Sequence, residues 1–239
     1  MDKLSLSKME SQRYPDHFRC ADKINAERLA LYGQLLLYGD FSALKFRVDL
    51  DQLNDELEFF SHCWVKYQKS KPDTYRMGLS VTSLDGGMSG VPDLQSLQEY
   101  MEKGGKAVSE NEFNVLTDAG KGISSVRGLI DEYYPSIGRS RFVKFGRGGH
   151  FPPHRDQSFH FEVPDYFRIF LPLSNCQSSN LLFVLEDKVI RYEPGRAYFF
   201  NAMKVHSVFS FVPDAITLAL SIPLTQENVR KTIRSFEVK

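Results

Sequence analysis

Three side chains in the second half of the chain have the types and the spacing of a metal site. His154 and Asp156 lie two residues apart in the segment GGHFPPHRDQ, and His206 lies in the later segment KVHSVFSF. Alternate residues of an extended strand project from the same face, so His154 and Asp156 can bind one ion and His206 can complete the set. Two imidazoles and one carboxylate occupy one face of an octahedral ion and leave positions open for exchangeable ligands. A His-x-Asp pair alone is weak evidence, because such pairs are frequent by chance.

Arg168 follows Asp156 closely and is the candidate for binding an organic anion. It begins the apolar segment RIFLPL, which we expect to be a central strand. A guanidinium binds a carboxylate through two parallel hydrogen bonds, so Arg168 can hold the far carboxylate of 2-oxoglutarate while the keto-acid end chelates a metal. A surface salt bridge is the alternative role for Arg168. Asn201 is a second candidate for contacting a co-substrate or a metal ligand, with turn formation as its alternative.

Other residues close to this motif are less suited to chemistry. His150 and His160 flank it, but their spacing does not fit the same ion, and we expect structural or substrate-side roles for both. Gly146, Gly148 and Gly149 predict a turn into the metal-binding strand rather than a phosphate loop, since no helix follows them.

Residues 138–223 have the pattern of a β structure that could carry these side chains. Short runs rich in Phe, Val, Ile and Tyr alternate there with Gly, Pro, Asn and Asp, which favour turns. Eight short strands in succession are typical of a jelly roll, whose two sheets can leave a pocket for a metal and a small molecule. The predicted strands cover residues 140–145, 150–157, 167–173, 180–185, 189–192, 197–201, 206–211 and 215–222.

We interpret the chain as one domain over residues 1–239, because 239 residues can build a single well-packed core. Residues 1–137 are expected to form a mostly helical N-terminal part, residues 138–224 the double-stranded β-helix, and residues 225–239 a tail of undecided structure. The predicted fold class is therefore mainly β, a cupin-like jelly roll braced by helices.

Apolar residues at three- and four-residue spacing predict the bracing helices. Leu50, Leu53 and Leu57 follow Asp49 on one helical face, which should pack on a sheet. We also expect a helix capped by Asp93, a helix over 123–134 with a buried apolar stripe, a strand over 76–82, and a loose arm over residues 1–20.

Composition argues against several classes of protein. The 30 basic and 30 acidic residues cancel, so no bulk charge favours a nucleic acid or an anionic membrane surface. Three widely separated cysteines suggest neither a disulfide framework nor a thiolate metal cluster. The start of the chain is polar, and no segment approaches the ~20 apolar residues of a membrane span. We therefore expect a cytoplasmic protein without a membrane partner, and the sequence does not indicate its oligomeric state.

The segment 138–223 resembles the double-stranded β-helix of the Fe(II)/2-oxoglutarate-dependent oxygenases. Within that superfamily it is most similar to the aspartyl/asparaginyl β-hydroxylase group, in which a His-containing strand is followed by an Arg-x-x-x-Pro-Leu strand. The corresponding segment here is RIFLPL, from Arg168 to Leu173. A Pro-Gly pair, the strand AYFFN and the downstream His206 continue the match.

This resemblance implies that the three predicted ligands hold Fe(II) and that 2-oxoglutarate and O2 are co-substrates. It implies a dioxygenase that hydroxylates a C–H bond of an amino acid or of a peptide or protein side chain, with succinate and CO2 as co-products. Arg168 is the implied clamp for 2-oxoglutarate. One departure affects this role: many members carry an arginine or lysine shortly after the second histidine, where this chain has Ile216 and Thr217.

Two other classes of protein fit some of the same residues. A cupin-like metal enzyme would use the ion without 2-oxoglutarate, and absence of a cation for the co-substrate would favour it. A non-catalytic jelly-roll binding module would need no complete ligand set, so loss of any ligand would favour it. The chain has Arg168 and all three candidate ligands, which favours the 2-oxoglutarate-dependent enzyme.

Overall fold

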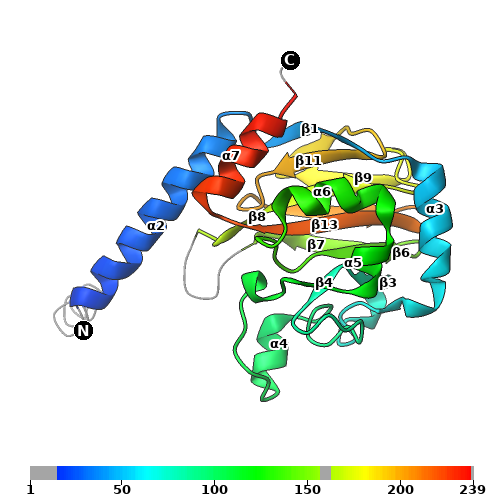
Figure 1. Cartoon of the computed structure of the whole chain (residues 1–239), viewed down its shortest axis with the longest axis horizontal. Coiled ribbons are helices and arrows are strands. Elements are labelled where there is room, and N and C mark those ends of the chain that lie inside the picture. The colour runs from blue at the N-terminus through cyan, green and yellow to red at the C-terminus, as the bar shows by residue number, and fades with distance from the viewer. Residues whose placement is uncertain (1–14, 157–162, 238–239) are drawn as a thin grey trace.

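The computed structural model describes residues 15–156 and 163–237, and its strands form two main antiparallel sheets (Figure 1). The strands are β1 (Phe41–Arg47), β2 (Val65–Lys66), β3 (Arg76–Ser80), β4 (Thr82–Ser83), β5 (Val115–Leu116), β6 (Arg141–Phe145), β7 (His150–His154), β8 (Tyr166–Pro172), β9 (Leu181–Leu185), β10 (Lys188–Ile190), β11 (Arg196–Phe200), β12 (His206–Ser210) and β13 (Ala215–Pro223). The larger sheet has the order β1-β11-β8-β13-β6-β3-β2, and the smaller has the order β10-β9-β12-β7. β4 and β5 form a separate pair.

The eight strands from β6 to β13 form a jelly roll, that is, a double-stranded β-helix. β6, β13, β8 and β11 are neighbours in the larger sheet, and the other four strands form the smaller sheet. This arrangement confirms the predicted fold class, a mainly β jelly roll braced by helices. Each of the eight predicted strands begins within one residue of an observed strand. The predicted end of the second strand, residue 157, lies outside the described residues, and β7 ends at His154.

Alternate residues of β13 face two different environments. Leu218 and Leu220 point to the helices and belong to the core between helices and sheet. Thr217 and Ser221 lie on the opposite face, which is directed into the roll, and both are buried. Because both faces of the larger sheet are covered, β13 has a nearly continuous apolar sequence, and its small or polar residues mark the interior face.

The N-terminal part contributes strands as well as helices to this architecture. β1 pairs with β11 and β3 pairs with β6, so residues before 138 extend both edges of the roll's larger sheet. The prediction of a strand over residues 76–82 is confirmed by β3 and β4. β1 was not predicted, because its partner is distant in sequence and the segment FSALKFR lacks a strong alternating pattern.

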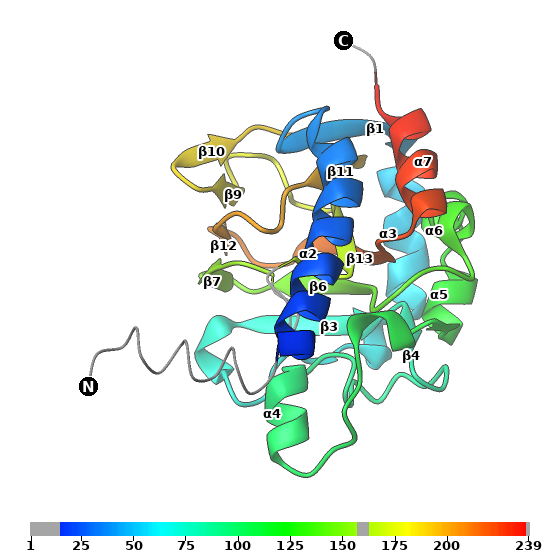
Figure 2. The same ribbon diagram turned by 90° about the vertical axis from the view of Figure 1, so that its left-hand side faces the viewer.

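Helices cover the outer face of the larger sheet. The α-helices of the described residues are α2 (Pro15–Leu36), α3 (Leu50–Phe59), α4 (Leu97–Glu102), α5 (Asp118–Gly122), α6 (Arg127–Tyr133) and α7 (Gln226–Ser235). Figure 2 shows α3, α5, α6 and α7 on one side of the larger sheet and the smaller sheet on the other. Asp49 caps α3 by accepting hydrogen bonds from the N–H groups of Asp51 and Gln52. Leu53 and Leu57 are buried as predicted, and each contributes about 1.5–3 kcal/mol by leaving water.

Two helical predictions differ from the structure. Ser96 caps α4, whereas Asp93 is buried and accepts a hydrogen bond from the Ser80 hydroxyl. The prediction of Asp93 as a cap was wrong because its long-range partner is not visible in the local sequence. α2 begins at Pro15, within the segment expected to be a loose arm, and residues 1–14 lie outside the described part of the chain.

The C-terminal segment after residue 224 is mainly the helix α7. Thr225 caps it by accepting a hydrogen bond from the N–H of Asn228, and Val229 is buried in the core. The helix predicted over 123–134 is confirmed as a 3-10 turn followed by α6, and its apolar stripe is buried: Ile123, Val126, Leu129, Ile130 and Tyr133. Within residues 15–156 and 163–237, no helix has both the length and the apolar character needed to cross a membrane.

Candidate metal centre

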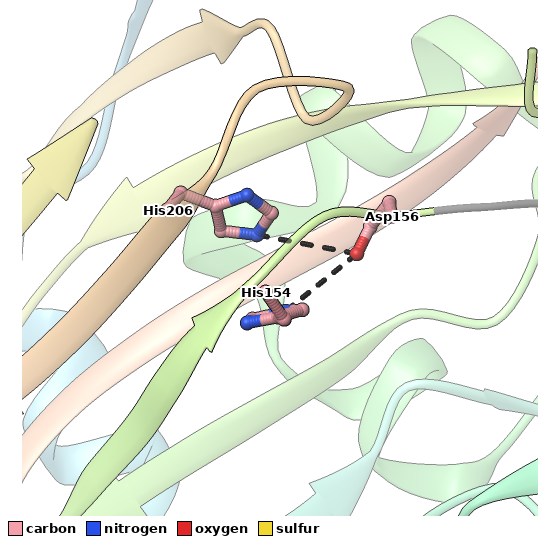
Figure 3. Close-up of side chains that lie close together, drawn as sticks. All are labelled: His154, Asp156 and His206. Carbon is pink, nitrogen blue, oxygen red and sulfur yellow. Dashed lines mark ion pairs between the residues drawn. The ribbon is translucent and has the colours of Figure 1, made fainter. Parts of the chain in front are cut away.

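The smaller sheet brings the three predicted ligands together. β7 ends at His154, which pairs directly with His206 at the start of β12. Asp156 follows β7, and its backbone N–H donates to the carbonyl of Ala202, which holds this segment against the turn before β12. Figure 3 shows both imidazoles facing one oxygen of Asp156. Nε2 of His154 lies 3.7 Å, and Nε2 of His206 3.9 Å, from Asp156 Oδ1.

The orientation of both imidazoles suits a metal ion. Ligand atoms from the three residues lie within 4.8 Å of one another, so the group could hold one ion. Nδ1 of His154 lies 2.8 Å from the Pro152 carbonyl oxygen, and Nδ1 of His206 lies 3.0 Å from that of Lys204. A proton on Nδ1 donates in each bond and leaves the Nε2 lone pair free for a metal. The donor set of two imidazoles and one carboxylate fits Fe(II) with open coordination positions.

Asp156 supplies the negative charge of this group. Its Oδ2 accepts a hydrogen bond from Arg168 Nε at 2.7 Å, which leaves Oδ1 directed at the histidines. Burial alone would raise the pKa of Asp156, but the charge of Arg168 and a smaller effect of His206 lower it to about 2. Asp156 is therefore ionised at neutral pH and can bind a cation without first losing a proton.

His206 is enclosed, whereas His154 is accessible. The rings of Phe200 and Phe183 lie 5.0 Å and 6.4 Å from the His206 ring. Burial lowers the pKa of His206 more than the charge of Asp156 raises it, which favours the neutral imidazole that binds metals. The side chain of His154 is 39% exposed, so the site opens on its side.

Arg168 lies inside the roll, so the surface salt bridge considered for it is wrong. In addition to its bond with Asp156, Nη1 donates to Ser221 Oγ at 2.6 Å and to Glu110 Oε2 at 3.3 Å. Nη2 makes no hydrogen bond to a residue within the described ranges. The arginine therefore orients a candidate metal ligand. Its role as a co-substrate clamp stays a prediction. Nη2 could bind a carboxylate without breaking the existing hydrogen bonds of Nε and Nη1.

Asn201 belongs to the turn before β12. Its Nδ2 donates to Asp40 Oδ1 at 2.8 Å, and its Oδ1 accepts a hydrogen bond from the N–H of Met203 at 3.3 Å. Both ends of the amide are therefore hydrogen-bonded to residues other than the three candidate ligands. This is the turn-forming role considered as the alternative for Asn201. The co-substrate contact predicted for Asn201 finds no support in these bonds.

The flanking histidines and glycines are separate from the ligand group. His150 packs on Phe209 with 6.2 Å between ring centres, and its Nδ1 lies 3.0 Å from the Gly148 carbonyl oxygen. Gly148 has a φ of 78°, which glycine adopts at low cost, and it forms the predicted turn between β6 and β7. His160 lies outside the described residues.

A cluster of charges that the sequence did not reveal adjoins the ligand group through Glu110. Glu110 lies in a short 3-10 helix, is ion-paired with Arg139 and lies 4.0 Å from Arg141. Burial would raise the pKa of Glu110, but Arg139, Arg168 and Arg141 lower it to about 2. The alternation of Arg139 and Arg141 at the start of an apolar strand is a signal that could have placed both on the interior face.

Comparisons with known proteins do not assign a family. No protein-family model and no curated protein matches the chain. It is similar to the solved structure of KdgF from Halomonas sp., with 22% identity over 38% of this chain and 73% of that chain, at a TM-score of 0.30. It is also similar to the ribosomal oxygenase YcfD from Escherichia coli, with 14% identity over 40% of this chain and 25% of that chain, at a TM-score of 0.29. An oxalate oxidase in complex with the substrate analogue glycolate has 12% identity over 67% of this chain and 57% of that chain, at a TM-score of 0.32. Similarity at this level does not indicate an activity for this chain.

Proposed function

We propose that the protein is an Fe(II)- and 2-oxoglutarate-dependent dioxygenase that hydroxylates a C–H bond of an amino acid or of a peptide or protein side chain. The observation that carries this proposal is the convergence of two imidazole Nε2 atoms and one carboxylate oxygen, from His154, His206 and Asp156. The resemblance of the surrounding motifs to the aspartyl/asparaginyl β-hydroxylase group supports the choice of co-substrate and substrate class. We also propose a cytoplasmic location, on composition alone.

Iron at this site would supply O2 activation. One oxygen atom enters the substrate C–H bond, and the other enters the succinate formed when 2-oxoglutarate loses CO2. The chain's own residues prepare the ligands. Arg168 holds Oδ2 of Asp156 so that Oδ1 is available, and backbone carbonyls fix the ring orientation of both histidines. Phe200 and Phe183 exclude water from the buried side of the ligand group.

The requirement for 2-oxoglutarate is the part of this proposal that depends on a cation. Thr217 is buried on the interior face of β13, and its hydroxyl can hydrogen-bond a carboxylate but cannot supply charge. Ile216 belongs to the core between helices and sheet. Neither residue can therefore provide the positive charge that binds the co-substrate. We assign this role to Arg168, whose Nη2 makes no hydrogen bond to a described residue.

Anaerobic loading with Fe(II) and then 2-oxoglutarate tests the proposed function. We expect a weak visible charge-transfer band from the chelate and succinate formation once O2 is admitted. His206→Ala, which removes a ligand, should show neither signal. His150→Ala, a matched control on the same strand as His154, should behave like the wild type. If the wild type binds Fe(II) but gives neither band nor succinate, a metal enzyme that does not use 2-oxoglutarate is favoured, and failure to bind Fe(II) would refute the metal centre.

A further inference from the structure

The interior of the roll contains more buried positive charge than negative charge. Four arginines are each at most 8% exposed: Arg76, Arg139, Arg141 and Arg168. Glu110 lies within 4.0 Å of the last three, and Asp156 lies 2.7 Å from Arg168, whereas none of the ion pairs among the described residues involves Arg76. A divalent metal at the ligand group would increase this excess. A buried charge without a counter-ion is strongly unfavourable, so this region is suited to an anionic ligand.

Arg76, on β3, is the least satisfied of these arginines. It is 3% exposed, and Nη2 donates to Gln68 Oε1 at 2.8 Å, whereas Nε and Nη1 are buried without a hydrogen-bond partner among the described residues. Its Cζ lies 3.9 Å from the Phe151 ring centre and 4.8 Å from that of Tyr67. These rings contact the faces of the guanidinium, and the N–H groups in its plane still need an acceptor.

Arg141, on the neighbouring strand β6, also has an unpartnered donor. Its Nη1 donates to the Arg139 carbonyl at 3.0 Å, and its Nε is buried without a partner in the described ranges. Its Cζ lies 5.8 Å from the Tyr67 ring centre, so Tyr67 contacts both Arg76 and Arg141. Burial would raise the pKa of Tyr67, but the positive charges of Arg141, Arg139 and Arg76 lower it.

Two series of contacts connect these arginines with the ligand group. Phe151, which stacks on Arg76, lies 6.2 Å from His154 between ring centres. On the other side, Glu110 lies 4.0 Å from Arg141 and 3.3 Å from Arg168, which binds the metal-ligand carboxylate. An anion held by Arg76 and Arg141 would therefore lie beside the metal centre, and one small organic molecule could contact both.

We propose that Arg76 and Arg141 form a subsite that binds a carboxylate of an organic ligand of the metal centre. Planar guanidinium edges match a carboxylate through charge-assisted hydrogen bonds. The carboxylate comes either from the molecule to be oxidised or from 2-oxoglutarate, in which case Arg76 and Arg141 hold its far carboxylate instead of Arg168. β3 lies outside the eight strands of the jelly roll, so the N-terminal part contributes to ligand selection. The identity of the ligand rests on the proposed function, whereas the existence of the subsite does not.

Calorimetric titration of the full chain loaded with Zn(II), which supports no redox chemistry, tests the subsite. The probes are 2-oxoglutarate, glutarate and a set of N-acetyl amino acids. The affinity of each N-acetyl amino acid is compared with that of its carboxamide, which lacks the carboxylate charge. We expect Arg76→Gln to weaken binding of at least one acid by about tenfold or more, since a charge-assisted hydrogen bond is lost. Arg196→Gln is the matched control, because Arg196 also has a buried unpartnered Nε but pairs with Glu193 and Glu237.

The outcomes distinguish the two sources of the carboxylate. Weaker binding of 2-oxoglutarate and glutarate alone assigns the subsite to the co-substrate, and weaker binding of the N-acetyl amino acids alone assigns it to the substrate. If the wild type binds none of the acids, or if a folded Arg76→Gln binds all of them within about twofold of the wild type, the subsite is refuted. Arg141→Gln provides the same test if Arg76→Gln does not fold. Absence of succinate in the oxygenation assay, with Arg76-dependent carboxylate binding intact, refutes the proposed function but not the subsite.

Discussion

Glu110 is a carboxylate shared by three buried arginines, Arg139, Arg141 and Arg168. Glu110→Gln keeps the shape of the side chain and removes its charge. The three guanidinium groups would then lose a common counter-ion while remaining out of water, which is strongly destabilising for buried ion pairs. We therefore expect the variant to unfold more easily than the wild type at neutral pH.

The magnitude follows from the pKa of Glu110, which falls from 4.5 to about 2 in the folded protein. One pKa unit corresponds to about 1.4 kcal/mol, so the ionised carboxylate contributes about 3 kcal/mol to the free energy of unfolding at pH 7. Because the folded state has the lower pKa, the contribution is complete above the unfolded-state pKa of ~4.5 and is lost as the pH falls toward ~2. The side chain is only 11% exposed, so solvent screening reduces this value little.

Urea unfolding of the wild type and Glu110→Gln at pH 7 and pH 3 measures this contribution. We expect the difference in free energy of unfolding to be about 3 kcal/mol at pH 7 and to decrease to about 1 kcal/mol at pH 3. Glu227→Gln is the control, because Glu227 forms an exposed ion pair with Lys231 and should contribute less than about 1 kcal/mol at either pH. An equal loss at both pH values for Glu110→Gln would refute the electrostatic explanation and indicate lost packing instead.

Four further predictions concern metal binding and packing. His206→Ala should lower the affinity for Zn(II) by at least about 100-fold in competition with a chromogenic chelator, because it removes a direct ligand. Arg168→Gln should lower it by about 10- to 100-fold, since Arg168 orients a ligand without binding the ion. Gly120→Ala should lower the free energy of unfolding by about 1–3 kcal/mol, because its Cβ would lie 2.2 Å from the Val81 carbonyl oxygen. Gly33→Ala, in open space on α2, should raise it by up to about 1 kcal/mol, and thermal denaturation measures both.

Each of these predictions has an outcome that contradicts it. Unchanged Zn(II) affinity in His206→Ala would remove that residue from the ligand set. Unchanged affinity in Arg168→Gln would show that the hydrogen bond to the metal-ligand carboxylate does not orient it. A Gly120→Ala variant as stable as Gly33→Ala would show that α5 can move away from Val81 without loss of packing.

The sequence alone predicted the jelly roll and the residues of the candidate metal centre. Alternating apolar residues and turn-forming residues are local signals, and they placed the starts of β6 to β13 within one residue. His154 and Asp156 are two residues apart, so their joint position depended only on local backbone geometry. The predicted jelly roll could bring His206 close to them, and its pairing opposite His154 agrees with that expectation.

Only the tertiary structure decided what surrounds these ligands. Glu110 meets Arg168 across 58 residues of sequence, and Asn201 meets Asp40 across 161, so no local pattern could indicate either pair. The same holds for the position of Arg76 beside Phe151, because β3 lies in the larger sheet and β7, which carries Phe151, lies in the smaller one. The spacing of Arg139 and Arg141 can indicate that both lie on one face of a strand, but it does not indicate their partners. The cost of burying a charged side chain is offset by partners that only the folded chain brings near.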